Sequence, residues 1–142
     1  MVLVKNLDSF DQLLAEFGTA IGITDLTFDA DGLCHLCIDA SRPITFRKDE
    51  ERHCLVMIGM IAETLPENLD ASVLRSMLAS SLIALRQREG ILSLDESSGM
   101  VVMHLSLSLS GLSLASMQEV FGRFIVDQIE WMRKLGAYQE KV

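Results

Sequence analysis

The chain has 142 residues, of which 49% are hydrophobic, and its formal net charge is −8 at pH 7. This length predicts a single domain over residues 1–142, large enough to bury its own hydrophobic core. The negative charge argues against nucleic acid as a partner, because a phosphate backbone attracts basic surfaces.

The sequence indicates neither export nor membrane insertion. The short apolar start is interrupted at once by Lys5, Asn6 and Asp8, which is unlike a signal peptide. The longest apolar stretch, Cys54–Ala62, is far shorter than the roughly 20 residues that a membrane helix needs. With three cysteines, an odd number, we expect reduced thiols and a cytoplasmic protein.

Residues Leu7–Ile21 are predicted to form an amphipathic helix, because apolar side chains recur at helical spacing and acidic ones occupy the other face. Asn6 or Asp8 is expected to cap its start, and Gly22 is suited to its end.

Short strands are expected next. Thr24–Asp29 and Leu33–Asp39 are predicted to form a hairpin, because the Asp-Gly pair that ends at Gly32 favours a tight turn. Ile44–Arg47 is predicted as a short edge strand. His53–Ala62 is continuously apolar, which is typical of a strand covered on both faces.

A second helix is predicted from Ala71 to about Leu85, with Asp70 as its cap. Between Arg75 and Arg86 it carries no charged residue, and a helix that is uncharged all round must be buried on more than one side. We therefore expect one side to pack on the chain's own sheet and the other to form a subunit interface, the alternative being burial within one chain. The residues expected in this interface are Leu74, Met77, Leu78, Ser81, Leu82 and Leu85.

The clearest pattern in the chain lies between Gly90 and Ser110. Every second residue from Val101 to Leu109 is apolar, which indicates a strand with one apolar face. The turn residues between Asp95 and Gly99 predict that this strand forms a hairpin with the segment before it.

A last helix is expected to begin near Ser113 or Ser116, where Ser116–Glu119 has the pattern of a capping box, and to end at Gly136. The order helix, strands, helix, hairpin, helix predicts an α+β fold with three helices and a twisted, mainly antiparallel sheet.

The sequence contains no recognisable catalytic or metal-binding motif. Cys34 and Cys37 are three apart on a predicted strand, so they point to opposite faces and cannot hold one metal ion. His35, His53 and His104 have no acidic partner at a fixed spacing. We expect no enzyme activity, cofactor or metal, and the competing hypothesis is a catalytic or small-molecule site in which these histidines converge.

Four segments carry a resemblance to a known family. They are the first helix (Phe10–Ile23), the segment Leu26–Asp39, the apolar helix Leu74–Leu85, and the hairpin Gly90–Met103 with the helix after it. In order, size and charge the chain resembles the class I type III secretion chaperones, small acidic dimeric proteins that include the Tir chaperone. The resemblance spans about residues 7–136.

The resemblance implies a homodimer, formed through the middle helix and the neighbouring hairpin, in the bacterial cytoplasm. Such proteins hold the N-terminal segment of a secreted effector in an extended form without using a nucleotide, and the effector lays apolar side chains in surface grooves and can add a strand to a sheet edge. The residues expected to line the cargo grooves are Phe10, Leu14, Phe17, Leu26, Phe28, Leu36 and Ile38.

A second hypothesis keeps the α+β fold but not the link to secretion. In that case the chain is a sensory or stand-alone domain, similar to the YbjN-like group, that binds other proteins.

Overall fold

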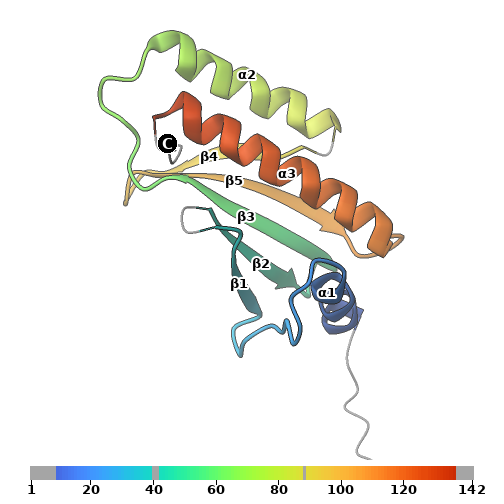
Figure 1. The fold of residues 1–142 in the computed structure, drawn as a ribbon. Helices are drawn as coiled ribbons and strands as arrows, with labels where there is room; N and C mark the ends of the chain where they lie inside the picture. Colours follow the sequence, from blue (N-terminus) through green and yellow to red (C-terminus); the bar gives the residue numbers. More distant parts are fainter. Residues whose placement is uncertain (1–8, 40–41, 88, 137–142) are drawn as a thin grey trace, which may run out of the picture.

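The computed structural model describes residues 9–39, 42–87 and 89–136. In this part of the chain, three helices accompany one five-stranded antiparallel sheet (Figure 1), which confirms the α+β fold predicted from the sequence. The elements are α1 (Ser9–Ala20), β1 (Leu33–Cys37), β2 (Pro43–Asp49), β3 (Cys54–Ala62), α2 (Ala71–Gln87), β4 (Ile91–Asp95), β5 (Met100–Ser108) and α3 (Leu114–Lys134).

The strands lie in the order β1-β2-β3-β5-β4, and each neighbouring pair is antiparallel. The predicted hairpin of β4 and β5 is confirmed, with Asp95 opposite Met100. Its turn is held by the Asp95 carboxylate, which accepts hydrogen bonds from the hydroxyls of Ser97 at 2.8 Å and Ser98 at 2.9 Å. These bonds hold the pKa of Asp95 below its ordinary value.

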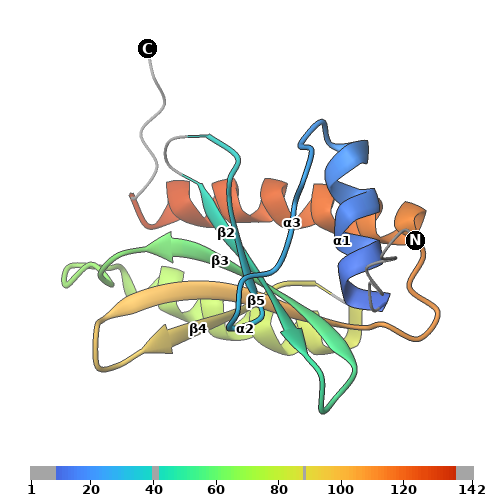
Figure 2. The same ribbon diagram turned by 90° about the horizontal axis from the view of Figure 1, so that it is seen from below.

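The three described helices lie on the same side of the sheet. Figure 2 shows the strands in front of α2 and α3, with α1 beside them. Helix α3 crosses β3, where a Cβ atom on Gly59 would meet the side chains of Phe124 and Gln128. Helix α1 packs beside α3, and α2 lies along β4. The opposite side of the sheet therefore carries none of these helices.

The centre of the core joins α1, β2 and α3 through three aromatic rings. The rings of Phe17 and Phe46 meet edge to face at a centroid distance of 5.6 Å, and Phe17 contacts Phe121 at 4.9 Å. Such aromatic pairs contribute about 0.5–1.5 kcal/mol beyond their buried area. They fix α1 against the sheet, and with it the position of the chain that follows α1.

The prediction of a strand at Thr24–Asp29 was wrong, and so was the hairpin that it would form with β1. Asp25 has a left-handed backbone (φ 61°), which interrupts an extended segment. Leu26 is buried against α1, where its Cβ would lie 2.8 Å from a Cβ on Gly18. Because this segment packs on the helix, β1 pairs with β2 instead.

Strand β2 was predicted as a short edge strand, and this too was wrong. It is seven residues long and lies between β1 and β3. Ile44 and Phe46 are buried on the helix side, while Thr45 and Arg47 point to the side without helices. Polar residues are tolerated in this inner strand because one of its faces is open.

Strand β3 lies at the centre of the sheet, but the prediction that it is covered on both faces was wrong. Leu55, Met57, Gly59 and Ile61 are buried, and the residues between them are only partly buried. The continuous apolar run therefore marks one face that packs on helices and one that does not.

The helix ends agree with the predictions in part. The backbone N–H of Ser72 donates to the Asp70 carboxylate, and left-handed glycines follow the ends of α1 (Gly22) and α3 (Gly136), as predicted. The capping box of α3 is formed by Ser113 and Ser116, and not by the predicted Ser116–Glu119 pair. The hydroxyl oxygen of each of these serines accepts a hydrogen bond from the backbone N–H of the other. The predicted caps Asn6 and Asp8 lie outside the described residues.

Candidate functional site

Helix α2 presents a row of leucines to solvent. Leu78 is 77% exposed and Leu85 is 71% exposed, and Leu74 and Leu82 on the same side are also exposed. Complete burial of a leucine side chain is worth roughly 1.5–3 kcal/mol, so such a row is unusual on an isolated domain and is typical of a protein contact. We call these four residues the α2 face.

The other side of α2 packs on its own chain. Val73 and Met77 pack against the core, and Ala84 is buried. The hydroxyl of Ser81 donates to the carbonyl oxygen of Met77 at 3.1 Å and lies 3.3 Å from that of Leu92 in β4. Of the six residues predicted in the dimer interface, Met77 and Ser81 therefore face inward, and the other four make up the α2 face.

A shallow apolar groove of about 300 Å³ continues the α2 face toward β4. Leu92 and Val101 lie at its base, and Leu74 and Leu78 form one wall. Leu94 of β4, which the sequence analysis did not single out, forms part of the other wall and is 51% exposed. Because exposed leucines lie beside an apolar groove, this surface can pack against a second apolar surface.

The seven residues predicted to contact cargo do not form one exposed groove. Five of them are buried in the core of the free chain: Phe10, Leu14, Phe17, Leu26 and Leu36. Only Phe28 and Ile38 are partly exposed. A cargo role for the set stays a prediction, and in this conformation only these two are accessible to a partner.

Phe28 lies before the first strand in the chain, and Ile38 lies directly after it. The ring of Phe28 lies 5.5 Å from the Lys48 ammonium. The N–H of Ile38 bonds to the carbonyl oxygen of Arg42. In the described residues β1 pairs only with β2. The backbone N–H and carbonyl oxygen of Leu33 already bond to Asp29, so it is the outer edge of β1 beyond Leu33 that is available to an added strand.

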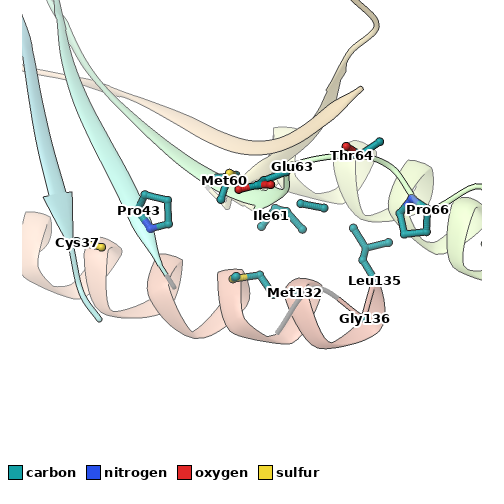
Figure 3. A pocket seen from close by; sticks show the side chains of 11 residues that line it. Cys37, Pro43, Met60, Ile61, Glu63, Thr64, Pro66, Met132, Leu135 and Gly136 are labelled. Atoms are coloured by element: carbon teal, nitrogen blue, oxygen red, sulfur yellow. The ribbon is translucent and has the colours of Figure 1, made fainter. Parts of the chain in front are cut away.

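A larger pocket of about 630 Å³ opens beside Cys37, where β1 ends (Figure 3). Pro43 of β2, Met60 and Ile61 of β3, and Met132 of α3 line it, together with residues that follow β3 and α3. The walls are mostly apolar side chains with no cluster of charges. We call it the end pocket. An apolar side chain from a segment lying along β1 could enter it.

Gln128 holds two walls of the end pocket together. It is fully buried in α3, and its side-chain N–H groups donate to the carbonyl oxygens of Pro43 at 3.2 Å and Met60 at 3.0 Å. The sequence analysis missed this residue. The signal was a polar side chain at a core position, one turn from both Phe124 and Met132.

The side of the sheet that faces away from the helices has an apolar centre. Its partly exposed members are Val56, Ile58 and Met60 of β3, Val102 of β5 and Ile91 of β4. None of these residues belongs to the core cluster or packs against it. We call them the open sheet face.

The three histidines are not brought together. His35 bonds to Thr45 at 2.9 Å, His104 bonds to Ser93 at 2.8 Å, and the His53 ring packs on Phe10. His35 and His104 lie on strands that are separated by β2 and β3. The site in which they converge is therefore not formed.

In the described part of the chain, no three histidine, cysteine or carboxylate side chains come together in a way that could hold a metal ion. Cys34 is buried and Cys37 is exposed, so the predicted opposite orientation is confirmed. Burial, and then the charge of Asp29, raises the pKa of the Cys34 thiol, which makes it a poor nucleophile. In the described residues, no helix has the length and apolar character to cross a bilayer.

Comparison with known proteins matches most of the chain to one family. The model of the Tir chaperone protein (CesT) family matches residues 12–132. The comparison with curated proteins gives no match.

Three solved structures share the fold. The HopA1-SchA chaperone-effector complex contains a chain with a TM-score of 0.73 and 26% identity, over 89% of this chain and 92% of that one. A chain of the ExsC-ExsE complex has a TM-score of 0.77 and 21% identity, over 93% and 97%. The Yersinia pestis type III secretion chaperone SycH, in complex with a stable fragment of YscM2, gives a TM-score of 0.69 and 16% identity, over 86% and 98%.

Proposed function

The chain belongs to the Tir chaperone protein (CesT) family, and from this we propose that it is a type III secretion chaperone. As a homodimer in the bacterial cytoplasm, it binds the N-terminal region of a secreted effector in an extended form. Binding keeps the effector soluble and competent for secretion. The observation that carries the proposal is apolar surface left open on three sides of a well-packed core: the α2 face, the end pocket and the open sheet face.

The α2 face is the proposed dimer contact. Leu74, Leu78, Leu82 and Leu85 from one chain pack against the same residues of its partner, and each chain offers the groove beside Leu94. A two-fold contact needs a surface that is complementary to itself, which a row of leucines beside a hollow provides. This contact also explains why α2 carries no charge between Arg75 and Arg86.

The cargo site is proposed to follow the first strand. Backbone groups on the outer edge of β1 give affinity for an extended segment without demanding a particular sequence. Selectivity comes from apolar side chains of the cargo that contact Phe28 or Ile38 or enter the end pocket. Ordering a disordered segment costs free energy, so a long contact over both chains of the dimer is favoured.

This function requires no catalysis, nucleotide or metal. The dispersed histidines are consistent with it, and so is the raised pKa of the Cys34 thiol. The family match favours this function over the alternative of a sensory or YbjN-like domain without a link to secretion.

The test begins with the complex from the native host. The chain is purified from cells whose type III system is active, and the bound protein is identified by mass spectrometry. The N-terminal segment of that protein is then co-expressed with the chain. We expect a complex of two chains with one effector segment, in which the segment resists proteolysis only at the contacted residues. The proposal would be contradicted if the effector were bound only in its folded form, or if the complex contained one copy of the chain and not two.

A further inference from the structure

A second groove lies on the outer surface of α3, beside the connection from α2 to β4. It measures about 510 Å³ and is separate from the end pocket and from the groove along β4. We call it the α3 groove. Its main lining residues are Glu119, Gly122, Arg123, Val126 and Asp127 of α3, with Glu89 from the connection.

Gly122 makes the hollow, and the chain's own packing does not require a glycine there. It lies inside the 21-residue helix α3, and a Cβ atom added to it would meet nothing within 4 Å. Glycine inside a helix lowers helix stability relative to alanine. The glycine therefore costs stability without making room for another part of the described chain, and it does make room for an outside group to approach the helix backbone.

The next turn of α3 adds an apolar surface to this notch. Val126 follows Gly122 by four residues, lies on the same side of the helix and is 56% exposed. A partner that enters the notch covers Val126 and removes apolar area from water.

The rim of the groove is acidic. Glu89, Glu119 and Asp127 outnumber the one lining cation, Arg123. Burial raises the pKa of Asp127, and the charges of Glu89 and Glu130 raise it further, against the opposing effect of Arg123 and Lys134. A cation placed between these carboxylates is favoured, because it offsets their repulsion.

We propose that the α3 groove docks a basic amphipathic helix from a second protein, at a site distinct from the cargo site. An apolar residue of that helix enters the notch at Gly122 and covers Val126, while lysines or arginines meet Glu89, Glu119 and Asp127. A helix fits better than a strand, because the backbone of α3 is bonded internally and offers no edge to pair with. The surface is thus suited to a different partner than the edge of β1.

The probe is a synthetic 18-residue helical peptide with leucines on one face and lysines on the other, titrated into the native dimer at physiological salt. Amide chemical shifts and fluorescence anisotropy report binding. We expect shifts centred on residues 118–127 and 89. Gly122→Arg fills the notch and reverses part of the charge, so it should weaken binding by about tenfold, the loss that an anchoring contact produces.

The matched control is Ala15→Arg, which adds the same charge to an exposed position of a different helix, α1, that does not line the groove. It should weaken binding by less than about twofold, since distant surface charges are screened. Circular dichroism checks that both variants fold. An equal loss in the two variants, shifts centred elsewhere, or no binding would each overturn the proposal. A Gly122→Arg chain that sediments as a monomer would also overturn it, because the groove would then be part of the contact between copies.

Discussion

Two glycines inside helices have opposite surroundings. A Cβ atom on Gly18 of α1 would lie 2.7 Å from the carbonyl oxygen of Ile23 and 2.8 Å from the Cβ of Leu26. Neither atom can move freely, because Leu26 is buried and the N–H of Ile23 donates a hydrogen bond to the carbonyl oxygen of Gly18. Gly122 of α3 has open space in the same place. The same residue type thus serves close packing in one helix and leaves a surface hollow in the other.

This contrast gives a prediction at the scale of single residues. Gly18→Ala should lower the free energy of unfolding by about 1–3 kcal/mol, because the added methyl group overpacks the contact with Leu26. Gly122→Ala should raise it by about 0.5–1 kcal/mol, because alanine is the better helix former and meets no obstacle. Urea denaturation of the two variants measures both changes. Equal effects in the two helices would show that the environment of Gly18 is not the cause.

Helix α2 differs from the other two helices in how little of it is buried by its own chain. In α2 only Ala84 is buried, whereas five residues are buried in α1 and five in α3. The hydroxyl of Ser81 and the side chains of Val73 and Met77 hold it to β4 and the core. Its outer side can therefore be changed without disturbing the core, which makes the dimer contact testable.

Leu78→Glu should dissociate the proposed dimer. It places a charge at a 77% exposed position in the centre of the α2 face, where burial against a second chain would leave that charge unpaired. Sedimentation velocity should then give one chain of 15.8 kDa in place of two, with the helix content of the protein unchanged.

Ser76→Glu, on the same helix but outside the α2 face, is the control and should leave the mass unaltered. Met77→Glu is a poor test, because Met77 packs against the core and its substitution would unfold the chain. A Leu78→Glu protein that keeps the dimer mass would rule out the α2 face as the contact.

The charge of the whole molecule has a local consequence on α3. In a chain with a net charge of −8, Asp127 lies near Glu89 and Glu130 and is partly buried. Its pKa is raised above the ordinary value of 3.8, so the folded state holds the proton more tightly than the unfolded state does. The ionised carboxylate therefore disfavours folding at neutral pH, and this penalty is lost as the pH falls through the raised pKa.

Asp127→Asn should accordingly stabilise the protein at pH 7, by less than about 1 kcal/mol because the group is still accessible to solvent. The difference from the unchanged protein should shrink as the pH falls and vanish below the ordinary value of 3.8. Thermal unfolding measured across this range checks it. Glu96→Gln, in the exposed turn between β4 and β5, is the control, for which we expect no stabilisation. A gain that persists at low pH would mean that charge is not the cause.

The sequence by itself determined the features that depend on near neighbours in the chain. Helical spacing located α1, α2 and α3, alternation located β5, and the turn residues after Asp95 located the hairpin. The lack of charge between Arg75 and Arg86 predicted that α2 is buried on more than one side, and the side that packs on β4 and the core is the one seen in the single chain. These patterns are visible because side chains return to the same face every three to four residues in a helix and every two residues in a strand.

Only the tertiary structure decided which apolar side chains stay accessible. Leu14 and Phe17 recur at helical spacing as the residues of a surface stripe would, yet both are completely buried, and Phe17 packs between Phe46 of β2 and Phe121 of α3. The partner of β1 and the two carbonyl oxygens bound by Gln128 likewise depend on segments far apart in the sequence. Burial is a sum over such distant contacts, and periodicity within one segment does not contain it.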